Sequence, residues 1–302
     1  MHLVCLGVVR RLIIFWTEGP NICCLSYVQI NRITEKLNDL SGKMPSDFVR
    51  EPRSLEEFKR WKATEFRSFL MYTGPYVLKN VLKHDLYIHF LCLCIAIRVL
   101  DDNNSSSNAI GYASMLLNWF VSKSVDYYGP TFTTYNVHNL IHLSEDVIKF
   151  QMTLLGMSVF SFENYLQRLK RLVHGKNMPL AQIVKRLGEI DCSDNKFLRK
   201  KHKSKVVPGG KDSWVFLKSG QLAQVIEINF DSLLCEIIPC RLFNDFFVVP
   251  CSSRYNKILS VPKNASVIEK LFKKLNSNTK LLVLRVEQEM LFFHYVMIVC
   301  FE

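Results

Sequence analysis

The spacing of apolar residues changes once along this chain, and that change limits its fold more than any other feature of the sequence. Before residue 190, apolar residues recur three or four positions apart, which is typical of amphipathic helices. After residue 213, short runs of alternating apolar and polar residues are separated by turn residues, which is typical of strands. The sequence therefore predicts an α+β protein with a helical part at 1–190, a polar basic linker at 191–212 and a small antiparallel β module, a barrel or sandwich, at 213–302.

Caps and breakers set the expected elements within these parts. Ser54 followed by Glu57 has the pattern of a capping box, and Gly129, Gly175 and Pro179 mark helix boundaries. We expect helices at 3–16, 26–40, 54–71, 76–83, 86–100, 109–126, 133–149, 162–174 and 179–190. We expect strands at 214–218, 222–229, 233–239, 245–250, 281–286 and 291–300, with one helix at 266–275.

Composition indicates a globular protein in a reducing compartment. Of 302 residues, 49% are hydrophobic and 22% are charged, which is enough apolar material for a core. Ten cysteines include no C-x-x-C pair, so no zinc finger is indicated. Free thiols without a secretory signal favour a reducing compartment.

Neither apolar stretch of the N-terminal third has the properties of a targeting or membrane segment. Arg10 and Arg11 split the first apolar run instead of preceding it, unlike a signal peptide. The longest run, 86–100, is short for a membrane span and contains His89 and Arg98. We therefore expect no membrane partner.

Positive charge is concentrated in one region. The net charge is +12, and residues 168–205 contain twelve Lys or Arg residues against three acids. A basic block of this size indicates a polyanionic partner, most often nucleic acid, although a solvated linker or nuclear-import tract has the same composition. The residues expected to contact DNA are Arg168, Lys170, Arg171, Lys176, Lys200, Lys201, Lys203 and Lys205.

The stretch from 133 to 187 contains the main candidates for metal binding and catalysis. His138 and His142 are spaced to share a helix face, as two metal ligands do. The H-E-x-x-H glutamate is missing and no third ligand is evident, so we predict packed or structural histidines. Glu163 opens the next helix, either as a cap on the helix dipole or as a metal-binding carboxylate beside a phosphate-binding surface.

Four segments together resemble one family. They are MHLVCLGVVRRL at 1–12, RWKATEFRSFLMYTGP at 60–75, TYNVHNLIHLSEDV at 134–147 and SFENYLQRLKRLVHGKNMPLAQIVKRL at 161–187. They resemble the C-terminal half of animal transposase-like proteins related to the CACTA (En/Spm) group, a region that in plant relatives is a domain of unknown function following the transposase core. The resemblance covers most of 1–190, and the β module also resembles the C-terminal segment of animal members.

The resemblance implies DDE chemistry, in which three carboxylates on an RNase H-like core hold two divalent metals that activate a nucleophile for attack on a DNA phosphate. Glu163, with Lys170 after it, matches the third acid, and His2 matches the histidine of a D-x-x-H pattern. The aspartate of that pattern would lie two positions before Met1, and the first acid further upstream. No metal site is therefore intact in this sequence, and Mg²⁺ or Mn²⁺ is expected only if the missing acids are restored. Residues 17–150 then correspond to an all-helical insertion placed before the last acid.

The expected protein is a transposon-derived chain, truncated at its N-terminus and catalytically inactive, with residual non-specific DNA binding in the nucleus. Helices that pack on the missing strands should expose apolar faces, and a homo-oligomer is expected as well. Two alternatives stay open. The chain is part of a longer, active metal-dependent transposase or nuclease, or it is a nuclear interaction module whose β part binds a protein partner. If the basic run is not an import signal, a cytoplasmic location is expected.

Overall fold

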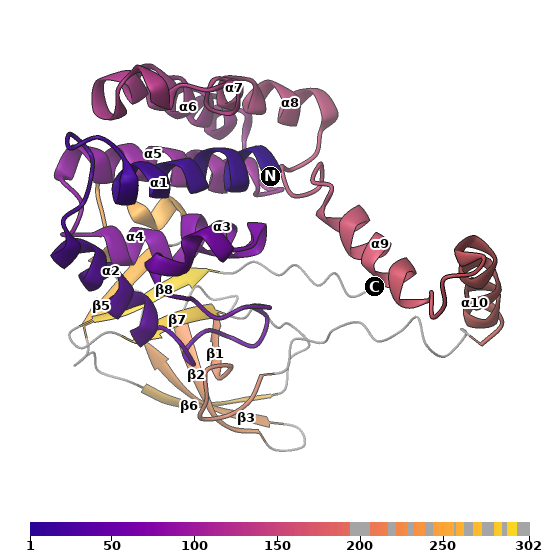
Figure 1. The fold of residues 1–302 in the computed structure, drawn as a ribbon. Helices are drawn as coiled ribbons and strands as arrows, with labels where there is room; N and C mark the ends of the chain where they lie inside the picture. The colour runs from indigo at the N-terminus through magenta and orange to yellow at the C-terminus, as the bar shows by residue number, and fades with distance from the viewer. Residues whose placement is uncertain are drawn as a thin grey trace.

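A computed structural model defines the architecture (Figure 1). It describes residues 1–193, 206–216, 222–228, 232–238, 244–256, 258–262, 268–273, 281–285 and 289–294. The chain is α+β, with the helices in the first two-thirds and the strands in the last third, as the sequence predicts. Within the described residues, every helix is too short or too polar to cross a membrane.

The helical part consists of short segments around two long helices. In chain order these are η1 (Leu3–Val9), α1 (Arg10–Glu18), α2 (Tyr27–Asp39), η2 (Leu55–Arg60), α3 (Ala63–Ser68), η3 (Phe69–Thr73), α4 (Gly74–Leu78), α5 (His84–Leu100), α6 (Ser107–Tyr128), η4 (Pro130–Phe132), α7 (Tyr135–His138), η5 (Asn139–His142), α8 (Leu143–Phe150), α9 (Phe160–Arg171) and α10 (Pro179–Ser193). In Figure 1, α6, α7 and α8 form one layer, α1 and α5 lie beneath it, and α2, α3 and α4 lie between that layer and the strands. Helices α9 and α10 project away from these layers.

The core is built around α5 and the N-terminal helix. Trp16 of α1 is fully buried, and its ring lies 5.9 Å from that of Phe90 on α5. Burying a large apolar side chain stabilises a fold by about 1.5–3 kcal/mol, so these helices anchor the domain. Cys92 and Cys94 are buried in α5, and burial raises their pKa values to about 12 and about 11. Both thiols are therefore neutral packing groups.

The prediction of a single helix at 54–71 is wrong. The chain forms η2, turns at Trp61, and begins again with α3. Trp61 has an extended backbone, which directs its ring against Phe66 and Phe69 at centroid distances of 5.4 and 5.6 Å. Glu65 then accepts a hydrogen bond from the Lys62 N–H at 2.7 Å and starts the new helix. Aromatic burial thus overrides the helical pattern here.

The described strands pair into two antiparallel four-stranded sheets, ordered β1-β2-β3-β6 and β4-β5-β8-β7. Their bounds are β1 Trp214–Phe216, β2 Leu222–Ile228, β3 Ser232–Ile238, β4 Asn244–Asp245, β5 Ile258–Pro262, β6 Ile268–Lys273, β7 Leu281–Arg285 and β8 Glu289–His294. Among these strands the pairing does not form a closed ring, and the barrel stays a prediction.

The helix predicted at 266–275 is wrong, and one strand was missed. Residues 268–273 form β6, which pairs with β3 so that Leu233 lies opposite Phe272. The missed strand is β5, which pairs with β4 and β8. Both strands depend on partners distant in the sequence, and such pairing outweighs local propensity.

The β part shares its core with the helices. Phe246, Phe247 and Ile258 are buried in the same apolar cluster as α1 and α5. Tyr112 of α6 donates a hydrogen bond from its hydroxyl to the carbonyl of Pro250 at 3.1 Å. Residues 1–190 and 213–302 are therefore packed as one structure, at least where both are described.

Candidate functional site

The structure brings together the two residues that the sequence analysis assigned to a catalytic remnant. Nε2 of His2 lies 3.2 Å from Oε1 of Glu163, although the residues are at opposite ends of the helical part. The ring of Phe160 packs against the His2 imidazole at a centroid distance of 4.3 Å. His2 can donate a hydrogen bond to the carboxylate, so the contact is a polar pair supported by an aromatic ring.

Packing of the N-terminal helix fixes the position of His2. Val4, Val8 and Val9 of η1 are fully buried, which holds the start of the chain against the core. Gly7 allows η1 to approach α7 closely, since a Cβ atom there would lie 2.8 Å from Cγ of Asn136. The backbone at residue 2 is therefore held by its neighbours in the core.

Glu163 is positioned by the start of α9. It lies in the first turn of this helix, where the positive end of the helix dipole stabilises a carboxylate. Its side chain is 54% exposed, and that of His2 is 31% exposed. The pair is thus accessible at the surface rather than buried.

Asp101 and Arg67 lie beside the same end of the chain. They form an ion pair at 2.8 Å, with 7% and 20% of their side chains exposed, and the Leu155 N–H donates to the other carboxylate oxygen of Asp101 at 2.8 Å. Burial lowers the pKa of the Met1 amino group, and Asp101 and Arg67 are close enough to act on it electrostatically. The sequence analysis missed both residues, because neither is part of a recognised motif.

These residues do not fit a two-metal centre. Glu163 has a histidine as its partner and no second carboxylate, and both oxygens of Asp101 are already engaged by Arg67 and Leu155. Across the described ranges, no group of three or more His, Cys, Asp or Glu side chains could hold a metal ion. One carboxylate cannot hold two metals, so the His2–Glu163 pair by itself is not a two-metal centre.

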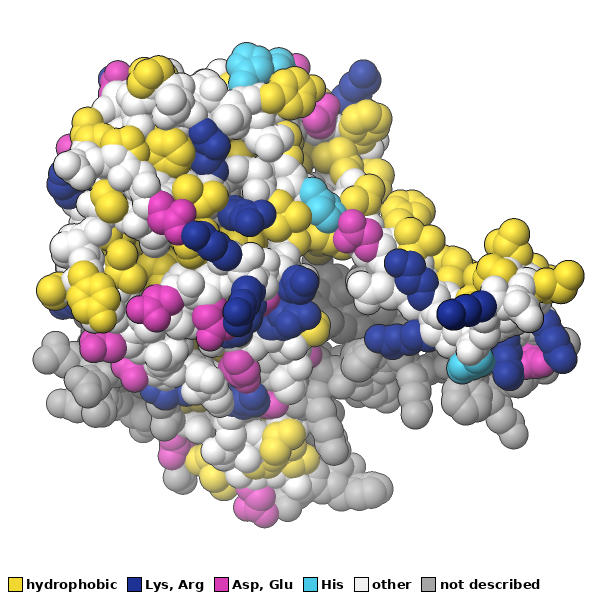
Figure 2. Space-filling view, viewed as in Figure 1, with side chains coloured by type: hydrophobic (Ala, Val, Ile, Leu, Met, Phe, Trp, Pro, Cys, Tyr) yellow, Lys and Arg dark blue, Asp and Glu magenta, His cyan; other side chains and the backbone are white. Residues whose placement is uncertain are grey.

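Helices α9 and α10 form an arm with two different edges. Figure 2 shows apolar side chains along one edge and Lys and Arg side chains along the other. The apolar edge includes Phe162, Tyr165 and Leu166, all exposed, with Phe162 at 70%. An amphipathic helix normally buries this face, and among the described residues nothing covers it.

The connection between α9 and α10 is held by Gln182, another residue that the sequence analysis missed. Its side-chain oxygen accepts from the N–H groups of His174 and Gly175 at 3.0 and 3.3 Å. Its amide nitrogen donates to the carbonyls of Gly175 and Asn177 at 3.2 and 2.5 Å. One side chain therefore fixes the turn between the two helices, and only a Gln three residues into α10 signals it in the sequence.

The basic residues predicted to contact DNA fall into two groups. Arg168, Lys170, Arg171 and Lys176 are exposed on the arm, and none of them forms a salt bridge with another described residue. The other four predicted contacts lie outside the described residues; they are Lys200, Lys201, Lys203 and Lys205.

Of the two predictions for His138 and His142, packed or structural, the first is wrong. Both rings are exposed, 5.6 Å apart between centroids, and Nδ1 of His142 lies 4.0 Å from Oε2 of Glu145. The helix turns Val137 and Leu140 inward instead, and both are fully buried. The histidines form a polar surface pair, and the short η5 segment between α7 and α8 allows this rotation.

Fold and site together define an α+β protein with a surface His–Glu pair and a projecting basic arm. The chain matches no protein-family model, and no curated protein or solved structure is significantly similar to it. The assignment of a function therefore depends on the geometry described above.

Proposed function

We propose that this chain derives from a CACTA-related DDE transposase and acts as a nuclear DNA-binding protein that does not cleave DNA. Its helical part corresponds to the insertion and the last helix of an RNase H-like core. The β part follows as a small barrel or sandwich.

The contact between His2 and Glu163 is the observation that carries this proposal. The resemblance assigns both positions to one catalytic centre, and the two residues lie 3.2 Å apart although they are distant in the sequence. The periodicity of the sequence gives no reason for this pairing, which the packing of η1 and α9 brings about. The exposed apolar face of α9 also fits, because a helix of an RNase H-like core packs on strands, and no strand among the described residues covers this face.

Loss of cleavage follows from the number of carboxylates. In-line attack on a phosphate needs metals held by several acids, and Glu163 is the single acid in the pair. Added Mg²⁺ or Mn²⁺ therefore has no complete site among the described residues. The second role of the family, holding DNA, needs only positive charge on an accessible surface.

DNA binding is assigned to the arm. Lysine and arginine side chains that are exposed and unpaired within the described residues can contact phosphates and release counterions. Such contacts give affinity that depends on salt and little on base sequence. Arg168, Lys170, Arg171 and Lys176 meet this requirement.

The test is fluorescence anisotropy of a labelled DNA duplex over a range of salt concentrations. The variant Lys170→Ala/Arg171→Ala/Lys176→Ala should bind more weakly. The slope of its plot of log K against log salt concentration should decrease in magnitude by about 2 to 3, or about 0.9 for each lost contact. The same measurement on Lys200→Ala/Lys201→Ala/Lys203→Ala reports on the remaining predicted contacts.

A charge-matched control separates local contacts from net charge. Arg10, Arg32 and Lys43 are exposed and lie outside α9 and α10, and replacing all three by Ala removes the same charge. This control should bind DNA as the wild type does. Equal affinity and salt slope for the arm variant and the wild type would refute the DNA-binding proposal.

The two alternatives give different results. Divalent-dependent plasmid nicking that disappears in Glu163→Gln would indicate an active enzyme, and a longer form of the protein with all three acids is where it should be sought. Nuclear localisation without retention on DNA at low salt would favour an interaction module whose β part binds a protein. Self-association stays a prediction, which sedimentation velocity tests.

A further inference from the structure

The apolar edge of the arm is a regular stripe that runs along both of its helices. At about 100° per residue, Phe162, Tyr165 and Leu166 share one face of α9. By the same spacing, Leu180 and Val184 share one face of α10. All five side chains are exposed. A stripe of this kind on a surface helix normally packs against another element, and the described part of the chain provides none.

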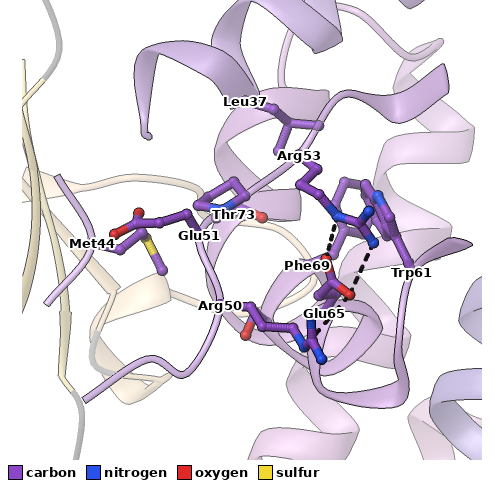
Figure 3. A pocket seen from close by; sticks show the side chains of 11 residues that line it. Leu37, Met44, Arg50, Glu51, Arg53, Trp61, Glu65, Phe69 and Thr73 are labelled. Carbon is purple, nitrogen blue, oxygen red and sulfur yellow. Dashed lines mark hydrogen bonds and ion pairs between the residues drawn. The ribbon is translucent and has the colours of Figure 1, made fainter. Parts of the chain in front are cut away.

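A small pocket beside Arg50, between α2 and α3, shows the contrast (Figure 3). Arg53 and Arg50 both pair with Glu65 there, at 2.7 and 3.9 Å. The apolar residues that line this pocket belong to the buried core; they include Leu37, Met44 and Phe69. The pocket therefore offers a partner neither an apolar surface nor an unpaired acid, whereas the arm offers a broad apolar surface.

The exposed area of the stripe matches what a specific dimer buries. Six large apolar side chains along the arm are between 49% and 78% exposed: Phe162, Tyr165, Leu166, Met178, Leu180 and Val184. Since a large apolar side chain carries roughly 150 to 200 Å² of surface, these six leave on the order of 600 to 800 Å² uncovered on each copy. A standard protein–protein interface buries about 800 Å² on each partner. Two stripes packed face to face therefore reach the size of a specific interface.

The charges of the arm permit this pairing. Arg168 and Arg171 on α9, and Lys185 and Arg186 on α10, lie on faces turned away from the stripe, and Figure 2 shows the basic side chains along the opposite edge of the arm. A helix is about 10 Å across, so pairing through the stripes holds the basic edges of two copies roughly 20 Å apart. That distance is more than about two Debye lengths at physiological ionic strength, so repulsion between the copies is weak.

The stripe suits a second copy better than it suits a charged partner. In a two-fold dimer both copies present the same patch, which must therefore be complementary to itself. An uncharged apolar stripe meets this condition, and a basic surface does not. A polyanionic partner would be attracted to the opposite edge of the arm, where the Lys and Arg side chains lie.

We propose that two copies of this chain dimerise by packing the apolar stripes of α9 and α10 against each other, with both basic edges left open. This inference names the surface through which the chain associates. It does not depend on DNA binding, because none of the predicted DNA contacts belongs to the stripe.

The experiment is sedimentation velocity of the full chain over a range of protein concentrations. Wild-type protein should show a monomer–dimer equilibrium. Leu166→Gln/Val184→Gln removes two apolar side chains from each copy without changing the charge, and should raise the dissociation constant of the dimer about a hundredfold, or about 2.7 kcal/mol. Added salt should leave the dimer unchanged or strengthen it, whereas it weakens DNA binding. Failure of one proposal is therefore distinguishable from failure of the other.

Val28→Gln/Met115→Gln is the matched control, because it removes two exposed apolar residues from α2 and α6. This variant should dimerise as the wild type does, and urea unfolding of every variant checks that the fold is kept. Photo-crosslinking from benzoylphenylalanine in place of Phe162 should map to residues 160–193 of the second copy.

Three results overturn the proposal. The first is a wild-type chain that stays monomeric at every concentration, and binding of that monomer to anionic lipid vesicles would assign the stripe to a membrane surface instead. The second is an unchanged dimer in folded Leu166→Gln/Val184→Gln. The third is crosslinking from position 162 to a different surface of the second copy.

Discussion

His89 should make the stability of this protein fall between neutral and mildly acidic pH. Its side chain is fully buried in α5, with the Phe120 ring stacked on it at 4.0 Å. Nε2 lies 2.8 Å from the Phe120 carbonyl, which can only accept, so Nε2 carries the hydrogen. Nδ1 lies 3.3 Å from the Tyr128 hydroxyl and can accept from it. The neutral imidazole is thus fully satisfied, and a second proton would break this arrangement.

The size of the effect follows from the pKa. Burial lowers the pKa of His89 from 6.5 to about 4. Above pH 6.5 the residue is neutral in both the folded and unfolded states. As the pH falls towards 4, the unfolded chain binds a proton that the folded chain does not, and the free energy of unfolding falls by about 1.4 kcal/mol per pH unit. The loss over this range is about 3 kcal/mol.

Urea unfolding at a series of pH values measures this loss. His89→Gln keeps an N–H donor and an acceptor but does not titrate, so it should lose about 3 kcal/mol less than the wild type between pH 6.5 and 4. His138→Gln removes an exposed histidine instead and should follow the wild type. Parallel wild-type and His89→Gln curves would show that the buried imidazole does not control acid stability.

Three further predictions concern the surroundings of the site. Arg67→Met should destabilise the protein by about 3 kcal/mol, because it leaves the buried Asp101 carboxylate without the charge of Arg67. Adding Asp101→Asn should recover part of this loss in urea unfolding. If the effects of the two substitutions simply add, the pairing is contradicted. Gly129→Ala should cost about 1 kcal/mol, because Gly129 ends α6 at φ 86°, and an unchanged thermal midpoint would refute this. Glu163→Gln should change stability by less than about 0.5 kcal/mol, since the pair with His2 is exposed; a large drop in calorimetry would mean that the pair is structural.

Much of the helical architecture could be predicted, because caps and periodicity act locally. Ser26 forms a capping box with Gln29, and α2 runs close to the predicted range. Helices α5 and α6 are also where their apolar runs indicate. These signals lie within the segments themselves, so no knowledge of distant contacts is needed.

The failures have the opposite origin. The break at Trp61 depends on two rings that bury its side chain, and the replacement of a helix by β6 depends on pairing with β3. His138 and His142 share a face as predicted, but that face points to solvent because Val137 and Leu140 pack better on the core. In each case the outcome was decided by packing or pairing in three dimensions, which the local pattern does not contain.

For the site, individual residues could be predicted from the sequence, but the contact between them could not. Glu163 and His2 were identified by resemblance, and their contact follows from the three-dimensional packing of η1 and α9. No sequence motif predicts the Arg67–Asp101 pair, because Arg67 lies in the last turn of α3 and Asp101 directly follows α5. The pocket beside Arg50 depends in the same way on the loop after α2.

The apolar cluster shared by α1, α5, Phe246, Phe247 and Ile258 has a consequence for dividing this chain. The basic segment near 191–212 looks like a natural cutting point, yet a cut there would separate Phe246, Phe247 and Ile258 from the rest of this core. Each piece should be less stable alone than in the whole chain, and the two pieces expressed together should associate.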